Sequence, residues 1–164
     1  MIKTERLVLD VLKDSDEEDV ISILSNPTVK ENYICYDLDY EGYKKQFKQL
    51  KLNSKIKIHY ARGIFLDGKL IGFINDARIK DDKIEIEMAL KPEARGLGYG
   101  TEALTAVIDE LFSKGYSTIS TYCFKSNSTY ANLLEKVGMK KLEREEKLTY
   151  RGNDVVCTFY TILK

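Results

Sequence analysis

A short run between two segments of different periodicity combines one cation with three glycines: Arg95, Gly96, Leu97, Gly98, Tyr99, Gly100 and Thr101. Glycine at every second position lets the backbone take positive φ and turn successive N–H groups the same way. Such a loop at the start of a helix binds an anion, most naturally a pyrophosphate. Without a ligand, the same residues would form an ordinary tight turn between a strand and a helix.

Two common phosphate loops do not match this run. A P-loop requires Gly-Lys-Ser/Thr at its end, but Gly100 is followed by Thr101 and Glu102. The dinucleotide fingerprint requires a third glycine where Thr101 stands, and an acidic residue about 20 positions later. Residues 117–119 at that distance are Ser, Thr and Ile, so neither motif is present.

The flanking segments predict the elements that would position the loop. Residues 84–90 (IEIEMAL) alternate between apolar and other side chains, which is typical of a strand with one buried face. Apolar residues after the loop recur with helical spacing at 104, 107, 108, 111 and 112, and Gly115 ends the pattern. We therefore expect a strand, the loop and an amphipathic helix.

The pattern Arg95-x-x-Gly98-x-Gly100 after an alternating strand resembles the acetyl-CoA loop of the GCN5-related N-acetyltransferase (GNAT) superfamily. Three further blocks resemble its ribosomal-protein-alanine-acetyltransferase-like branch: TERLVL at 4–9, GYGTEAL at 98–104, and Asn127 before a helix ending in EKVGM at 135–139. The four blocks occur in family order and span nearly the whole chain. The resemblance implies a single domain over 1–164, an α+β fold with a mostly antiparallel sheet, one parallel splayed strand pair, and helices on both faces.

The resemblance also implies where acetyl-CoA would bind as the co-substrate. The pantetheine arm would lie in the gap between the splayed strands, along Ala89 and Leu90, and the Ala89 N–H group would donate to the thioester oxygen. The N–H groups of residues 95–101 would bind the pyrophosphate, with Arg95 adding charge. Asn127, before the last helix, belongs to the same coenzyme site.

Three residues are candidates for proton transfer. Glu85 and Glu87 share one face of the strand, and solvent-exposed acids are the ordinary interpretation of such a pair. Family members often carry a base about ten residues before the loop arginine, which favours Glu85, and a bulge would transfer that function to Glu87. Tyr130 carries the only hydroxyl on the apolar face of its helix and is the candidate acid, with core packing as the alternative.

Residues 31–43 interleave tyrosines with acidic side chains. We predict that Tyr33, Tyr36, Asp37 and Asp39 contact a cationic amine acceptor, because aromatic faces and carboxylates both attract cations. In the family this region lines the acceptor cleft. The alternative is a solvated loop whose tyrosines partly pack on the core.

The remaining elements follow from periodicity and turn signals. We expect strands at 3–11, 56–66, 70–79, 117–124, 140–149 and 154–163, with Asp67 and Gly68 in a hairpin turn. Helices are expected at 17–25 after an Asp14 N-cap, at 42–52 after an Asp39 cap, and from Asn127 to Gly138. Asn26 and Pro27 should end the first of these helices.

Composition narrows the class of protein. Lys plus Arg and Asp plus Glu both number 26, and no polybasic run is present, which argues against a nucleic-acid partner. No apolar run is long enough for a signal peptide or a membrane span. Three isolated cysteines and one histidine predict neither a metal site nor a disulfide framework, and they fit a cytoplasmic protein.

We therefore expect an acetyl-CoA-dependent enzyme whose partner is an amine-bearing acceptor. The sequence allows several acceptors: a protein N-terminus, a polyamine, an amino-sugar drug or an amino acid. It also allows either a monomer or a homodimer. A non-catalytic module that binds CoA or a nucleotide, and an interaction protein using the tyrosine-rich loop, are the competing interpretations.

Overall fold

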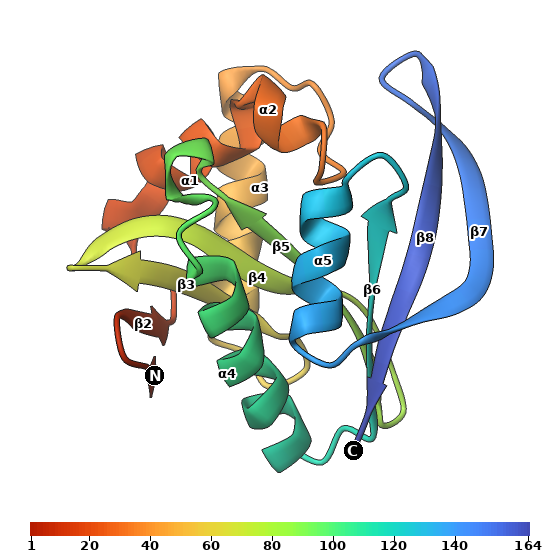
Figure 1. Cartoon of the computed structure of the whole chain (residues 1–164). Helices are drawn as coiled ribbons and strands as arrows, with labels where there is room; N and C mark the ends of the chain where they lie inside the picture. Colours follow the sequence, from red (N-terminus) through yellow and green to blue (C-terminus); the bar gives the residue numbers. More distant parts are fainter.

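The computed structural model describes residues 1–164 and contains one eight-stranded sheet (Figure 1). The strands lie in the order β1-β2-β3-β4-β5-β6-β8-β7, and only β5 and β6 are parallel. Their bounds are β1 Ile2–Lys3, β2 Leu7–Asp10, β3 Ala61–Leu66, β4 Lys69–Lys80, β5 Lys83–Leu90, β6 Thr118–Phe124, β7 Lys140–Tyr150 and β8 Asn153–Leu163.

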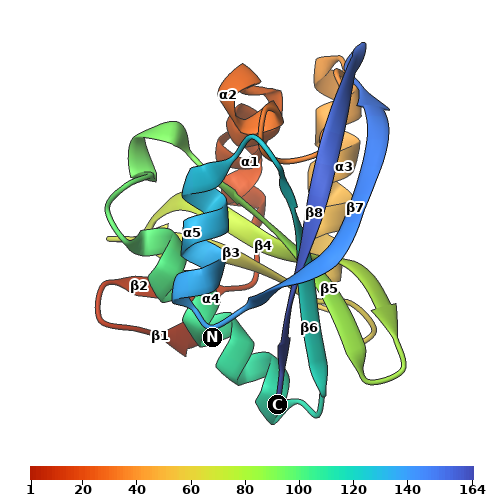
Figure 2. The same cartoon turned by 45° about the vertical axis from the view of Figure 1, so that its right-hand side comes forward.

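Helices cover both faces of this sheet (Figure 2). The helices are α1 Glu17–Ser25, α2 Pro27–Lys30, α3 Tyr40–Asn53, α4 Tyr99–Ser113 and α5 Ser128–Lys136, with 3-10 turns at Asp14–Asp16 and Pro92–Ala94. The apolar faces of α4 and α5 pack with Ile84 and Ile86 of β5 in one core. The apolar faces of α1 and α3 pack with Phe73 and Ala89 in a second core. Alternate residues of β5 therefore enter different cores, as the strand period requires.

The parallel pair is joined over only part of its length. Residues Lys83–Glu85 of β5 pair with Thr118–Ser120 of β6, and no pairing follows. Further on, β5 continues to Leu90 against β4, while β6 continues to Phe124 against β8. The strands therefore splay apart toward the start of α4, and the predicted fold class is confirmed.

Three predicted boundaries were wrong. The strand expected at 3–11 is two short strands, β1 and β2, and the strand expected at 56–66 begins only at Ala61. Asp14 does not cap α1; it starts a 3-10 turn that ends at Asp16, whose carboxylate accepts from the Lys13 N–H at 2.7 Å. The predicted end of the first helix at Asn26 and Pro27 is confirmed: α1 ends at Ser25, and Pro27 then starts α2, because a proline at the first helical position needs no N–H partner.

The structure shows the state of the cysteines and whether metal-ligand clusters or membrane-spanning helices are present. Cys35, Cys123 and Cys157 are buried free thiols. No group of three His, Cys, Asp or Glu side chains is placed to hold a metal ion. None of the helices combines the length and the apolar character needed to cross a membrane.

Candidate active site

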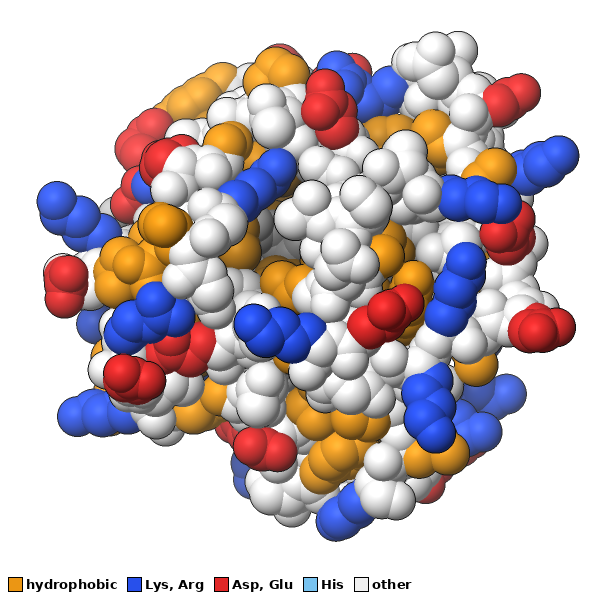
Figure 3. All heavy atoms as spheres, in the orientation of Figure 1, with side chains coloured by type: hydrophobic (Ala, Val, Ile, Leu, Met, Phe, Trp, Pro, Cys, Tyr) orange, Lys and Arg blue, Asp and Glu red, His pale blue; other side chains and the backbone are white.

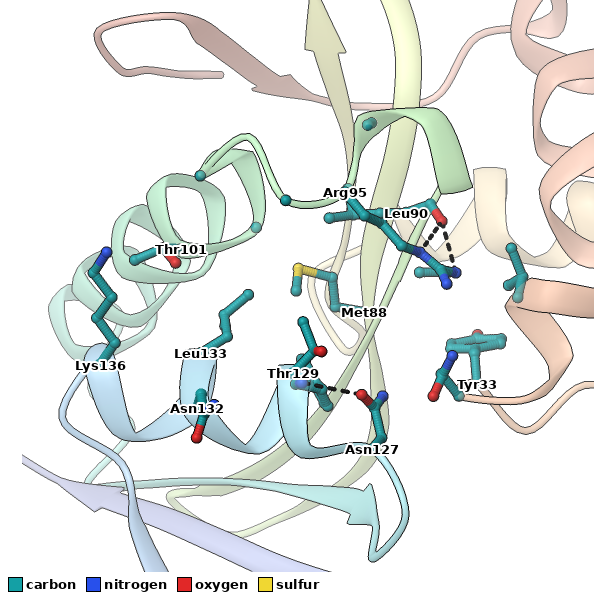
Figure 4. A pocket seen from close by; sticks show the side chains of 18 residues that line it. Tyr33, Met88, Leu90, Arg95, Thr101, Asn127, Thr129, Asn132, Leu133 and Lys136 are labelled. Atoms are coloured by element: carbon teal, nitrogen blue, oxygen red, sulfur yellow. Dashed lines mark hydrogen bonds between the residues drawn. The ribbon is translucent and has the colours of Figure 1, made fainter.

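A cavity of about 570 Å³ opens between the end of β5, the glycine loop and α5. Figure 3 shows a hollow in this face of the molecule with apolar side chains at its floor, and Figure 4 shows the lining from close by. The lining comes from α2 and the segment after it, from β5, from the loop and from α5. Its members include Tyr33, Met88, Ala89, Leu90, Arg95, Gly96, Gly98, Gly100, Thr101, Asn127, Tyr130 and Lys136.

The loop presents a series of unpaired donors. Glu102 is the first residue of α4 whose N–H group bonds back to the chain, to the Gly98 carbonyl at 3.1 Å. The N–H groups from Gly96 to Thr101 donate no hydrogen bond within the protein. Gly98 is the N-cap of α4 and has no side chain to satisfy them. Free N–H groups and the positive end of the helix dipole together form an anion site.

The three glycines serve two different purposes. Gly96 and Gly98 have φ of +74° and +85°, the left-handed region that favours glycine. Gly100, also expected at positive φ, instead lies within α4. A Cβ there would be 2.8 Å from Leu133 Cδ1 and 3.2 Å from Leu90 Cδ1. The missing side chain at Gly100 thus lets α4 lie close to the ends of the Leu133 and Leu90 side chains.

Arg95 lies between the loop and the splayed strands (Figure 4). Its Nε and Nη2 atoms donate to the Leu90 carbonyl at 3.3 and 3.1 Å. Partial burial lowers the pKa of the guanidinium, and the nearby Glu31 carboxylate opposes this shift. An arginine remains charged after a modest shift, so Arg95 contributes a cation to the cavity wall.

The backbone of β5 faces the gap at Met88 and Leu90, not at Ala89. The Lys91 N–H group donates to the Ile71 carbonyl of β4 at 2.8 Å. Hydrogen-bonded pairs alternate along an antiparallel ladder, so Ala89 is also bonded to β4, while the N–H groups of Met88 and Leu90 face away from it. The predicted donation by the Ala89 N–H group is therefore wrong, because strand register directs that group into the sheet.

Glu87 occupies the splayed part of β5, whereas Glu85 pairs with Ser120 in the joined part. Asn75 of β4 lies directly opposite Glu87. Burial raises the pKa of Glu87 to about 7; the Tyr122 hydroxyl opposes the shift, and the charge of Glu85 adds to it. A half-buried carboxyl group that ionises near neutral pH is suited to accept a proton.

Tyr130 and Asn127 lie side by side on the α5 wall. Asn127 caps α5 by accepting from the Tyr130 N–H at 3.0 Å, which leaves its own NH₂ group free of a partner within the chain. Burial raises the pKa of the Tyr130 hydroxyl, against an opposing contact with Thr121, so the phenol stays protonated at neutral pH. Both residues line the cavity, as the sequence predicted for a shared site.

Only Tyr33 of the predicted acceptor residues reaches the cavity. Its hydroxyl donates to Asn75 Oδ1 at 3.1 Å, opposite Glu87. The backbone that follows is held by two distant tyrosines: the Ile34 N–H donates to the Tyr122 hydroxyl at 3.0 Å. The Tyr150 hydroxyl, from the end of β7, accepts from the Cys35 N–H at 3.1 Å, and its single proton is within reach of the Tyr33 and Cys35 carbonyls, at 3.2 and 3.0 Å.

The other three predicted acceptor residues lie elsewhere. Tyr36 is 70% exposed. Asp37 pairs with Lys30 at 2.6 Å and with Arg151 at 3.1 Å. The Asp39 carboxylate caps α3 by accepting from the Gly42 N–H at 2.8 Å. The carboxylates of Asp37 and Asp39 are thus used within the protein, and none of the three residues lines the cavity.

Sequence reasoning missed a stripe of α5 that faces the cavity. Thr129, Asn132, Leu133 and Lys136 line it, and Lys136 points toward Thr101 at the start of α4 (Figure 4). Their spacing of three or four residues is a helical signal that was available beside the apolar stripe. The side chains of Leu97 and Tyr99, which were assigned to the coenzyme, are absent from the lining; Leu97 is 56% exposed.

Comparisons with known proteins concern the fold and the family. No curated protein matches the sequence. A GNAT-family acetyltransferase from Bacillus anthracis shares 24% identity and a TM-score of 0.81, over 99% of this chain and 97% of that one. Ribosomal-protein-S5-alanine acetyltransferase from Vibrio fischeri shares 19% identity and a TM-score of 0.82, over 99% and 95%.

Spermidine N-acetyltransferase from Vibrio cholerae, in complex with CoA and spermine, shares 18% identity and a TM-score of 0.83, over 98% and 96%. Identities this low show a shared fold. The model of the acetyltransferase (GNAT) domain matches residues 6–140, which is most of the chain. The protein therefore belongs to the GNAT acetyltransferase domain family.

Proposed function

We propose that the protein transfers an acetyl group from acetyl-CoA directly to a primary amine, on a protein N-terminus or a small molecule. The observation that carries this proposal is the meeting of the splayed strands with the loop of free N–H groups at one cavity. The backbone groups of Met88 and Leu90 suit the amides of a pantetheine arm, because buried polar groups need partners. The N–H groups of residues 96–101 suit its pyrophosphate.

Glu87 is our candidate for the general base. An amine must lose a proton to attack and to leave a neutral amide, and a carboxylate with a pKa of about 7 is largely ionised in a weakly alkaline solution. Bound acetyl-CoA supplies the thioester carbon that the amine attacks. The N–H groups of Met88 and Leu90 face the gap and are the candidates to donate to the thioester oxygen as it becomes negative.

Tyr130 is our candidate for the general acid. When the carbon–sulfur bond breaks, the departing thiolate requires a proton. Tyr130 lines the cavity and keeps its proton at neutral pH, because burial raises its pKa. One proton passes from the amine to Glu87, and one passes from Tyr130 to the thiolate. Glu87 then loses its proton to solvent and Tyr130 regains one from solvent, so both residues return to their starting state.

A protein N-terminus and a polyamine remain the two leading acceptors. The neighbours in structure include an enzyme named for each kind of amine. The groups around Glu87 that come from other elements are the uncharged side chains of Tyr33, Asn75 and Tyr122. They do not favour a polycation over a singly charged terminal amine.

Two measurements test the proposal. Acetyl-CoA at 100 times its Kd should stabilise the fold by about 2.7 kcal/mol, or roughly 5–10 °C in Tm for a chain of this size. ATP and NAD at the same concentration are the controls, and a larger shift with either would show that the loop has another ligand. Release of free thiol from acetyl-CoA is then followed with peptide N-termini, spermidine, aminoglycosides and amino acids as acceptors.

A non-catalytic CoA-binding module of the same fold is the alternative. It predicts the same thermal shift, but no acceptor-dependent thiol release with any amine. No thermal shift with CoA or acetyl-CoA would contradict both interpretations.

A further inference from the structure

Residues near the start of the chain hold the glycine loop from outside the cavity. The Arg6 guanidinium donates through Nη1 to the Leu97 carbonyl at 2.9 Å and through Nε to Glu102 Oε2 at 2.7 Å. It also lies 4.6 Å from the centre of the Tyr99 ring. One planar side chain therefore joins the middle of the loop to the first turn of α4.

Glu102 receives further contacts from the same segment. Its Oε1 atom accepts from the Thr4 hydroxyl at 2.5 Å and from the Arg6 N–H at 2.8 Å. Partial burial raises the pKa of Glu102, but the hydrogen bonds from Thr4 and Arg6 outweigh this effect and hold the pKa below its usual value. The carboxylate is therefore ionised and doubly paired at neutral pH, a charge-assisted arrangement that is stronger than neutral hydrogen bonds.

These contacts lie on the outer side of the loop. A Cβ built on Gly98 would be 3.1 Å from Arg6 Nη2, so the guanidinium packs against the Cα of Gly98. Thr4, Arg6 and Glu102 are not among the residues that line the cavity. Arg6 contacts the loop and Thr4 contacts Glu102 in the first turn of α4, and both contacts lie outside the cavity lining.

We propose that Thr4, Arg6 and Glu102 form a brace that holds the loop in its anion-binding conformation before the coenzyme arrives. The proposal rests on the proposed function, because the anion is taken to be the pyrophosphate of CoA. A loop with two left-handed glycines and no internal N–H bonds would otherwise lose conformational freedom when it binds. Holding the loop in advance removes that cost from binding, so Arg6 and Glu102 are positioning residues for the coenzyme.

The test is a double-mutant cycle on CoA binding, measured by calorimetry. Arg6→Gln and Glu102→Gln should each weaken CoA binding about tenfold, which equals about 1.4 kcal/mol. The double variant should also lose about tenfold, because either change already breaks the brace. Lys3→Gln is the matched control: Lys3 lies in the same segment, is exposed and forms no ion pair, and its removal should leave binding unchanged.

Steady-state kinetics separate positioning from general structural damage. The brace predicts a KM for acetyl-CoA that rises about tenfold, with kcat at saturating acetyl-CoA and KM for the amine within about twofold of wild type. Arg6→Lys keeps the charge and serves if Arg6→Gln does not fold. The Arg6→Lys variant should still bind CoA more weakly, because one ammonium group cannot replace the guanidinium nitrogens that reach both Leu97 and Glu102.

Two results would overturn the brace. The first is an affinity for CoA equal to that of the wild type in Arg6→Gln or in Arg6→Lys. The second is a loss of CoA affinity in the double variant that approaches one hundredfold, as expected if the two single losses add. If wild-type protein itself failed to bind CoA, the proposed function would fall, and the brace with it.

Discussion

Replacing Glu87 with glutamine should slow acetyl transfer and at the same time stabilise the protein in alkaline solution. Both effects have one cause, which is the partial burial of a carboxyl group in the splayed part of β5. Burial disfavours the charged form, so the folded protein keeps the proton on Glu87 at pH values where the unfolded chain has lost it.

The size of the stability effect follows from the pKa. The value rises from 4.5 in the unfolded chain to about 7 in the folded protein. The raised pKa contributes stability that is fully present below pH 4.5 and is lost as the pH rises through 7. At pH 8 the loss is about 3 kcal/mol at most, since one pKa unit is about 1.4 kcal/mol. Glu87→Gln should therefore exceed the wild type in Tm at pH 8 by up to about 10 °C, and by little at pH 4.

The kinetic assay measures kcat/KM for the amine between pH 5.5 and 9, expressed per unprotonated amine. In the wild type this quantity should rise about tenfold per pH unit below 7 and level off above it. In Glu87→Gln it should be flat and lower by about 10²–10³-fold, which is the usual contribution of a general base.

Glu85→Gln is the matched control, two residues earlier on the same face of β5. It should keep the rate and move the inflection to lower pH, because the charge of Glu85 helps to raise the pKa of Glu87. A wild-type rate and inflection in Glu87→Gln would refute the assignment. If Glu85→Gln were slow instead, Glu85 would be the base. If both variants kept the wild-type rate, water or the substrate itself would accept the proton of the amine.

Three further predictions concern other parts of the site. Gly100→Ala should keep the free energy of urea unfolding within about 1 kcal/mol of wild type, because the preference of a helix for alanine offsets the shift of Leu133 Cδ1, 2.8 Å from the new Cβ; a loss above about 2 kcal/mol would show that α5 cannot yield. Tyr130→Phe should lower kcat with little change in KM for acetyl-CoA, and an unaltered kcat would remove the hydroxyl from the reaction. Asp39→Ala should cost about 1 kcal/mol of stability through the lost cap on Gly42, whereas Asp39→Asn should not. An amine KM raised in both variants would show that the Asp39 carboxylate acts on the acceptor after all.

The coenzyme side of the site was largely predictable because its signals are local in sequence. Alternation before residue 91 and helical spacing after residue 103 place the loop between a strand and a helix, and the structure has β5 and α4 there. The resemblance added the splayed pair, which no periodicity shows. Gly100 was misread because a glycine inside a helix and one at positive φ are identical in sequence.

The acceptor side was less predictable because it depends on contacts between distant residues. Asp37 seemed free to attract a cation, yet Arg151 lies 114 positions later and pairs with it. The direction of the Ala89 N–H group depends on the register between β4 and β5, which sequence alternation does not give. The environment of Glu87 likewise comes from Asn75, Tyr33 and Tyr122, which belong to three other segments.

The hydroxyl of Tyr150 has a consequence for the order in which the molecule forms. It bonds to the backbone at Tyr33 and Cys35, across a separation of 115 residues or more. A chain emerging during synthesis can form β1 to β5 and the helices between them before residue 150 exists. The Tyr122 hydroxyl of β6 holds the Ile34 N–H group, but the contacts at Tyr33 and Cys35 form only when the last hairpin, β7 and β8, joins the sheet. The wall beside Glu87 should therefore reach its final form only after the last hairpin has joined the sheet, later than the elements on either side of the coenzyme loop.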